Sequence, residues 1–209
     1  MDSQDWDARY GATELVWGTE PNRWVVRETS ALPAGRALDL AAGEGRNSIW
    51  LAGRGWRVTA VDFSEVAVER GRRLAAAGPA EAAGRLEWVH ADALRHEPEP
   101  DGYQLVLVVY LHLPAEQRRV VLGHAARALA PGGTLLVVGH ATANLTGGVG
   151  GPRDAGVLYS PPDIVADLAG HGLRTVLAEE VRRPAVTAEG RRAEAIDTLV
   201  RLERERPAG

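Results

Sequence analysis

Two residue types are missing from this sequence. The 209 residues include neither cysteine nor lysine, and all 24 basic residues are arginine. Without cysteine the chain has no thiolate nucleophile, no disulfide and no thiolate metal site. Without lysine it has no side-chain amine for a Schiff base and no Walker A phosphate loop. Covalent chemistry through either side chain is therefore excluded.

Long apolar runs and an excess of positive charge are missing too. No stretch is apolar for long enough to span a membrane, and the start, Met1 to Trp6, has neither the basic region nor the apolar run of a signal peptide. We therefore expect a cytoplasmic protein with no membrane partner. The formal net charge is -4 and the pI is about 5.9, which argues against nucleic acid as the main partner.

The composition is that of one folded domain. Hydrophobic residues make up 45% of the sequence and charged residues 25%, as is usual for a globular protein. A chain of this length can bury a substantial core but leaves little room for a second domain. We predict a single domain over residues 1–209, with an N-terminal helical cap over 1–30 and an α/β core over 36–202.

The stretch from Arg36 to Asn47 organises the rest of the chain. The apolar run from Ala37 to Ala42 is typical of a buried parallel strand. Gly43 and Gly45 then allow a sharp turn and a close approach of the backbone to a ligand. A helix follows, and its first N–H groups face the turn. The pattern predicts a ligand-binding turn at the carboxyl end of a strand.

This turn departs from the one that binds dinucleotides. The dinucleotide pattern is G-x-G-x-x-G, but Ser48 occupies the third glycine position. Asp39 and Glu44 also place negative charge where two phosphates would lie. Asp62 ends the next strand about 20 residues later, the spacing of a carboxylate that binds ribose hydroxyls. A neutral or cationic ligand that carries a ribose is therefore favoured.

Four motifs in order resemble those of class I S-adenosylmethionine-dependent methyltransferases. They are Asp39 to Asn47, Val61 to Ser64, Ala91-Asp92, and Ala130 to Gly133 after a long helix. The resemblance spans roughly residues 6–202. It is strongest to small-molecule enzymes of the tellurite-resistance and thiopurine type, which also begin with a Trp-rich segment. It implies transfer of a methyl group from S-adenosylmethionine to a small-molecule acceptor by in-line displacement.

Alternating strand and helix patterns, together with this resemblance, predict a doubly wound Rossmann-like fold. The resemblance implies a mostly parallel, seven-stranded sheet that ends in an antiparallel hairpin. Helices are expected to begin near Pro21, Ser64, Pro114 and Pro161. The expected strands cover residues 37–42, 57–62, 85–90, 103–109, 134–139, 175–181 and 195–202.

The resemblance also implies which residues bind the cofactor. Asp39 and Asn47 are expected near its ammonium group. Asp62 is expected to bind the ribose and Asp92 the adenine. The full predicted set of cofactor-binding residues is Asp39, Ala41, Gly43, Gly45, Asn47, Asp62, Phe63, Asp92, Ala93 and Tyr110.

Two histidines follow strands at the carboxyl edge, where open α/β sheets bind ligands. His112 and His140 are both predicted to be catalytic and to contact the substrate, with His112 proposed as the base and His140 equally well placed. The alternative is that His112 only fills space or hydrogen-bonds to a backbone carbonyl. Tyr10, Trp17 and Tyr159 complete the predicted substrate residues. None of the six histidines forms an i, i+4 pair of the helical metal-site kind, so no metal is expected.

Two other functions stay open. A nicotinamide-dependent oxidoreductase can share the fold, although Ser48 and Glu44 argue against it. A cofactor-binding protein without turnover is also compatible, because methyl transfer needs no fixed catalytic triad. Sulfur, oxygen, nitrogen and inorganic acceptors all fit these residues, as does any oligomeric state. The glycine-rich stretch from Thr146 to Gly156 is predicted to be a mobile lid.

Overall fold

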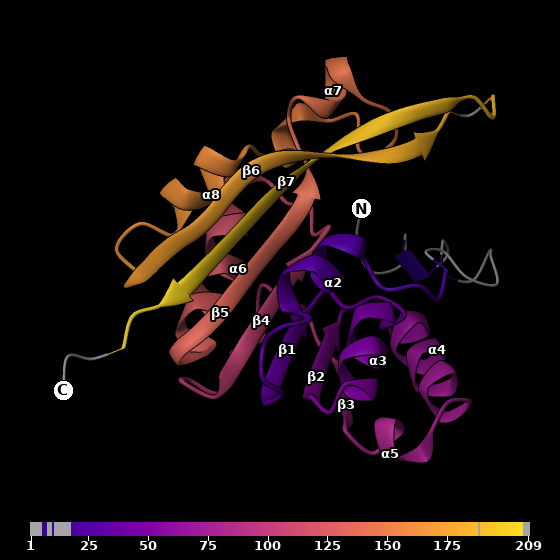
Figure 1. Ribbon diagram of the computed structural model, residues 1–209, viewed down its shortest axis with the longest axis vertical. Coiled ribbons are helices and arrows are strands. Elements are labelled where there is room, and N and C mark those ends of the chain that lie inside the picture. The colour runs from indigo at the N-terminus through magenta and orange to yellow at the C-terminus, as the bar shows by residue number, and fades with distance from the viewer. Residues whose placement is uncertain (1–5, 8–9, 11–17, 188, 207–209) are drawn as a thin grey trace.

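The computed structural model describes residues 6–7, 10, 18–187 and 189–206. Its centre is one sheet, whose strands are β1 (Arg36–Leu40), β2 (Arg57–Asp62), β3 (Leu86–His90), β4 (Tyr103–Val109), β5 (Leu129–His140), β6 (Leu173–Val186) and β7 (Arg192–Arg204). Their order across the sheet is β3-β2-β1-β4-β5-β7-β6 (Figure 1). Neighbours from β3 to β5 run parallel, whereas β7 lies antiparallel between β5 and β6. The predicted α/β fold, with a mostly parallel seven-stranded sheet and an antiparallel hairpin, is confirmed.

Helices connect most of these strands. In the described part of the chain they are α2 (Arg23–Thr29), α3 (Arg46–Gly53), α4 (Glu65–Ala76), α5 (Ala80–Ala83), α6 (Ala115–Ala128), α7 (Asn144–Gly147), the 3₁₀ helix η1 (Ala155–Val157) and α8 (Pro161–Asp167). The predicted N-terminal cap lies largely outside the described residues, and α2 is its main described part.

Both faces of the sheet are covered by helices (Figure 1). Leu38 and Leu40 of β1 share a buried cluster with Val121 of α6. Ala37, on the opposite face of β1, shares another with Leu51 of α3. This alternation follows from the two-residue period of a strand. Because both faces are buried, the central strands are almost wholly apolar, and this made them predictable from sequence.

Polar side chains mark where the helices begin. Ser64 caps α4 as predicted, because its hydroxyl accepts the backbone N–H three residues later. α8 begins at Pro161, also as predicted. α2 begins two residues after Pro21, since the Asn22 side chain accepts the backbone N–H of Trp24 at 2.8 Å. An asparagine N-cap satisfies a free N–H group of the first turn, which a preceding proline does not do.

The C-terminal hairpin is longer than predicted. The strands expected over 175–181 and 195–202 run instead over Leu173–Val186 and Arg192–Arg204. β5 ends at His140, opposite Asp197, whereas the β6–β7 ladder continues to the pair Val186 and Arg192. This overhang extends past the end of β5 (Figure 1). Its charged residues hid it in the sequence, because they are as typical of a surface loop as of an exposed strand.

Other differences are small. β5 begins at Leu129 instead of Thr134, because Leu129 pairs with Tyr103 across a register irregularity. The short helices α5 and α7 have four residues each, too few to give a periodic signal. No helix in the described ranges is long and apolar enough to cross a bilayer.

The loop after β5 is hydrogen-bonded to β7. Asn144, which is 3% exposed, donates to the carbonyl of Gly150 at 2.8 Å and accepts from the N–H of Ile196 at 2.8 Å. Val149 donates to the carbonyl of Glu194 at 2.9 Å. The predicted lid is therefore attached to the hairpin at its amino-terminal end, and its movement stays a prediction.

Candidate functional site at the carboxyl edge of the sheet

The chain turns sharply at the end of β1. Ala41, Gly43 and Gly45 all have positive φ angles, of 62°, 59° and 78°. Such an angle is unusual for alanine and marks a strained position of the kind found at functional sites. A Cβ atom at Gly45 would overlap the ring of Trp88. The turn thus needs glycine at residue 45 both for its backbone angle and for its packing.

Asp62 holds this turn in place. Its Oδ2 accepts the N–H of Gly43 at 2.7 Å, and its Oδ1 accepts the N–H of Ser64 at 2.9 Å. Burial raises the pKa of Asp62, and the bonds from Ser64 and Gly43 act against that shift. The carboxyl group predicted to bind a ribose therefore lies beside the glycine turn, in a fixed orientation.

Asp39 is a buried carboxyl group with one unpaired oxygen. It is 1% exposed, and its Oδ2 accepts the Ser48 hydroxyl at 2.7 Å. Its Oδ1 is buried and hydrogen-bonds to no residue that the structure describes. Burial raises the pKa of Asp39 to about 7. Because a buried polar atom normally has a partner, the unpaired Oδ1 fits a cationic ligand group such as an ammonium.

The neighbouring predicted residues also lie at this edge, with varied contacts. Asn47 accepts the backbone N–H of Asn22 at 2.9 Å and so ties α3 to the start of α2. Asp92 accepts the N–H of Leu94 at 2.9 Å through Oδ1 only.

Phe63 and Ala93 follow β2 and β3. The Phe63 carbonyl lies 3.0 Å from Nε2 of His90. Ala93 is 9% exposed and packs into the core. Phe63 and Ala93 therefore contribute backbone atoms beside Asp62 and Asp92, and no reactive side-chain group.

Glu44 does not present the free charge that the sequence suggested. It is 3% exposed, and it forms an ion pair with Arg70 at 2.7 Å. The carbonyl of Tyr10 accepts another bond from Arg70, at 2.8 Å. The electrostatic argument against a pyrophosphate thus rests on Asp39 and not on Glu44.

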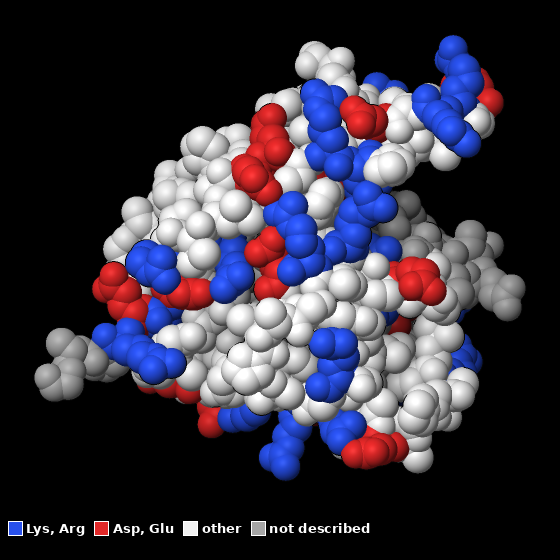
Figure 2. Space-filling view, viewed as in Figure 1, with Lys and Arg blue, Asp and Glu red and all other residues white. Residues whose placement is uncertain are grey.

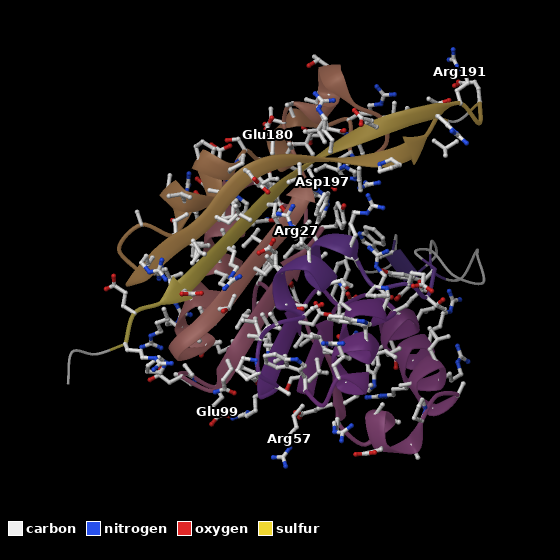
Figure 3. The ribbon with its side chains drawn as sticks, viewed as in Figure 1. Arg27, Arg57, Glu99, Glu180, Arg191 and Asp197 are labelled. Carbon is white, nitrogen blue, oxygen red and sulfur yellow. The ribbon has the colours of Figure 1, made fainter. Side chains whose placement is uncertain are left out.

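A second cluster surrounds Asp197, where the hairpin crosses the end of β5 (Figure 3). Asp197 is fully buried. Its Oδ2 accepts three bonds, from the Tyr110 hydroxyl at 2.7 Å, Arg183 Nε at 2.8 Å and Trp24 Nε1 at 3.0 Å. Tyr110 has a positive φ of 56°. Burial raises the pKa of Tyr110 to about 12, so its hydroxyl is a donor at neutral pH.

The structure brings the two predicted histidines together. Nε2 of His112 accepts the backbone N–H of His140 at 3.0 Å, and the two rings are 5.4 Å apart. Burial, and next the charge of His140, lower the pKa of His112 to about 4. Nδ1 of His140 is buried, 3.5 Å from Oδ1 of Asp197. The pKa of His140 is also lowered by burial, and Asp197 opposes that shift.

The predicted substrate residues occupy different places. Tyr159 is 1% exposed, and its ring lies 6.0 Å from that of His112. Tyr10 is 4% exposed and lies near Arg70. Trp17 lies outside the described residues. No group of three or more His, Asp or Glu residues in the described ranges is arranged to hold a metal ion.

Sequence reasoning missed Asp197 and Arg183. A signal was present for Asp197, a single acidic residue inside the apolar run from Ala195 to Val200. A buried charge in such a run needs a partner. No comparable signal marked Arg183, because arginine is frequent throughout the hairpin.

Comparison with known proteins finds a family whose model matches part of this chain. Residues 37–133 match the model of the methyltransferase domain family. A relative from Clavibacter sepedonicus, a demethylmenaquinone methyltransferase, is 38% identical over 117 residues, which are 54% of this chain and 46% of the relative. The chain thus spans about half the length of the curated relatives that it matches.

Two solved structures share the fold. The N-methyltransferase NodS from Bradyrhizobium japonicum WM9, solved with S-adenosyl-L-homocysteine, superposes with a TM-score of 0.72 at 18% identity and covers 100% of both chains. TehB from Haemophilus influenzae superposes with a TM-score of 0.71 at 15% identity, over 98% of this chain and 68% of TehB.

Proposed function

We propose that this chain, which belongs to the class I S-adenosylmethionine-dependent methyltransferases, transfers a methyl group to a small-molecule acceptor. The observation that carries the proposal is the unpaired oxygen of Asp39 beside the glycine turn that Asp62 holds. S-adenosylmethionine combines an ammonium group, a ribose and a positively charged sulfur. An edge with two buried carboxyl groups suits such a ligand.

Each part of this edge has a role in binding. Asp39 would accept from the ammonium group, and Gly43 and Gly45 let the backbone approach the amino-acid end of the cofactor. Asp62 would bind the ribose hydroxyls, and the free Oδ2 of Asp92 the adenine amino group. When bound, the cofactor supplies a methyl group on a good leaving group, so the protein mainly aligns the acceptor and excludes water.

His140 is the better placed of the two predicted bases. The Nε2 lone pair of His112 is used by the backbone of His140, so His112 orients this region of the chain. His140 faces Asp197 through Nδ1. No described residue hydrogen-bonds to Nε2 of His140. That nitrogen could therefore take a proton from the acceptor. Nδ1 of His140 and Oδ1 of Asp197 lie 3.5 Å apart and form no hydrogen bond.

The relatives do not point to one acceptor. By their names, one acts on demethylmenaquinone and another methylates nitrogen. The chain covers only part of the first of these proteins, and its identity to the second is low. The proposal therefore specifies a small molecule and leaves the accepting atom open.

Thermal denaturation tests the proposal directly. S-adenosylmethionine or S-adenosylhomocysteine should raise the melting temperature, and NAD and NADP should not. At about 100 times Kd the stabilisation is roughly 2.7 kcal/mol. Asp62→Ala should weaken binding, because hydrogen bonds to a charged group contribute about 1.5–3 kcal/mol each.

The matched control is Glu99→Ala. The Glu99 side chain is 61% exposed and pairs with Arg36, the first residue of β1, so its loss should leave cofactor binding unchanged. Mass spectrometry should then detect S-adenosylhomocysteine across a panel of small thiols, phenols, amines and oxyanions. Stabilisation by NAD alone would support an oxidoreductase instead, and cofactor binding without turnover on any acceptor would support a binding protein.

A further inference from the structure

Arg183 has donors that the protein does not use. Its Nε donates to Asp197 at 2.8 Å and to the Tyr110 hydroxyl at 3.1 Å. No residue in the described ranges accepts from its two terminal nitrogens. The side chain is 26% exposed, so these nitrogens are open to a ligand. An arginine held through Nε still offers two parallel N–H groups, the arrangement that binds an oxyanion at two points.

The neighbours of Arg183 make this arrangement rigid. The guanidinium lies 5.8 Å from the centre of the Tyr110 ring, and Asp197 is fully buried beneath it. A long side chain normally loses rotamer entropy when it binds a ligand. Arg183 has already lost most of that freedom to its two partners. A ligand would therefore meet a preorganised pair of donors.

A second arginine acts on the same position. Burial lowers the pKa of Arg46 at the start of α3, Asp39 opposes that shift, and the charge of Arg183 adds to it. The two guanidinium groups therefore repel each other, and an anion bound by Arg183 would reduce that repulsion. Figure 2 shows arginine side chains gathered over the β6–β7 hairpin, beside the hollow under its tip.

From these contacts we infer that Arg183 binds an oxyanion of the methyl acceptor, a carboxylate or a phosphate, at the edge where β4 and β5 end and the β6–β7 hairpin continues past them. The inference rests on the proposed function, because it concerns the acceptor of the same site. The rings of Tyr110 and His140, with centres 5.1 Å apart, lie beside this position. Aromatic acids are therefore suitable probes.

The test compares the binding of benzoate, phenyl phosphate and benzamide by calorimetry. It is run with and without saturating S-adenosylhomocysteine. In the wild-type protein at least one of the two anions should bind tenfold or more tightly than neutral benzamide. Arg183→Gln should reduce this preference to about onefold, with cofactor affinity unchanged. The probe that is preferred identifies the oxyanion as carboxylate or phosphate.

The adjacent residue supplies a matched control. Arg182 points to the other face of the strand, where it is 57% exposed and pairs with Glu194 at 3.3 Å. Arg182→Gln removes the same charge and should keep the wild-type preference. Arg183→Lys serves if the glutamine variant fails to fold. Its ammonium can still pair with Asp197 and keeps the charge, but it lacks the planar pair of parallel donors, so the preference should fall below tenfold.

Two results would overturn the inference. One is equal binding of anions and benzamide to the wild-type protein. The other is a preference that survives in both Arg183 variants. A protein that binds no S-adenosylhomocysteine would instead count against the proposed function, while the measurement without that ligand still decides the role of Arg183.

Discussion

At the scale of single residues, Asp39 shows how a binding site can cost stability. Its carboxyl group is buried with one oxygen unpaired, and such a group lacks the hydrogen bonds that it has in water. Burial raises its pKa to about 7, against about 3.9 in an unfolded chain. The folded protein therefore holds a proton that the unfolded chain releases between these two pH values.

The sign of the resulting pH dependence follows from this difference. A raised pKa gives stability that is fully present below about pH 3.9 and lost as the pH rises to about 7. Asp39→Asn cannot ionise and avoids the loss. Relative to wild type, its free energy of unfolding should improve by up to about 4 kcal/mol between pH 4 and pH 8, at about 1.4 kcal/mol per pKa unit. Urea denaturation at both pH values measures this.

The same substitution should weaken cofactor binding, because an amide offers the ammonium group no charge. Ser48→Ala is the control, since it removes a partner of Asp39 and leaves the carboxyl group in place. If the stability of Asp39→Asn depended on pH as that of the wild-type protein does, the pKa of Asp39 would not be raised. Asp39 would then be ionised in the folded protein at neutral pH.

Substitution of His140 and substitution of His112 should have different effects on turnover and on its pH dependence. His140→Gln should bind cofactor normally but lose turnover by about 10²- to 10⁴-fold, the usual contribution of a general base. The acidic limb of the pH–rate profile should disappear with it. That limb should lie below pH 6.5, because the pKa of His140 is lowered. The charged or titratable groups around it are Asp197, Arg183, Tyr110 and His112.

His112→Gln is the matched variant, because a glutamine oxygen can still accept the N–H of His140. It should keep the acidic limb even if its rate is lower. If instead the limb vanished in His112→Gln and persisted in His140→Gln, His112 would be the base, as the sequence first suggested.

At the scale of elements, patterns within one segment of chain predicted what local physics decides. The apolar run of β4, the Ser64 cap of α4 and the glycine turn after β1 each depend on neighbours in sequence. All three stand in the structure where they were predicted. The carboxyl-edge positions of Asp39 and Asp62 followed from them, because parallel strands place their ends together.

Contacts between distant segments were not predictable in the same way. Asp197 meets Trp24 across 173 positions and Tyr110 across 87, so no local pattern signals either bond. The unpaired oxygen of Asp39 and the bond to the His112 lone pair also depend on how distant segments pack, so the sequence does not show them. The sequence identified His112 and His140 as candidates, but only their mutual bond distinguishes their roles.

At the scale of the whole molecule, the two parts of the sheet have different tasks. The parallel strands carry the glycine turn and the carboxyl groups at the proposed cofactor site. The hairpin contributes Arg183 and Asp197 to the proposed acceptor side. Asp197 joins α2, β4 and β6 to β7 through one buried oxygen. The acceptor side is therefore built only when the hairpin docks on the rest of the sheet.

Removal of this junction should destabilise the whole protein. Asp197→Ala removes the oxygen that accepts from three buried or half-buried donors, and breaking a buried charge pair costs about 3–5 kcal/mol. For a chain of this size, 1 kcal/mol lowers the melting temperature by about 2–4 °C, so a fall of roughly 6–20 °C is expected. Differential scanning calorimetry measures this fall in the melting temperature.

Two further variants serve as controls. Trp24→Phe removes only one of the three donors and should cost about 1 kcal/mol. Asp197→Asn keeps the shape and one acceptor oxygen, and should fall between the two. If Asp197→Ala melted within 2 °C of wild type, α2 and the hairpin would be held by their apolar contacts alone, and Asp197 would serve only to hold Arg183 and Tyr110 at the site.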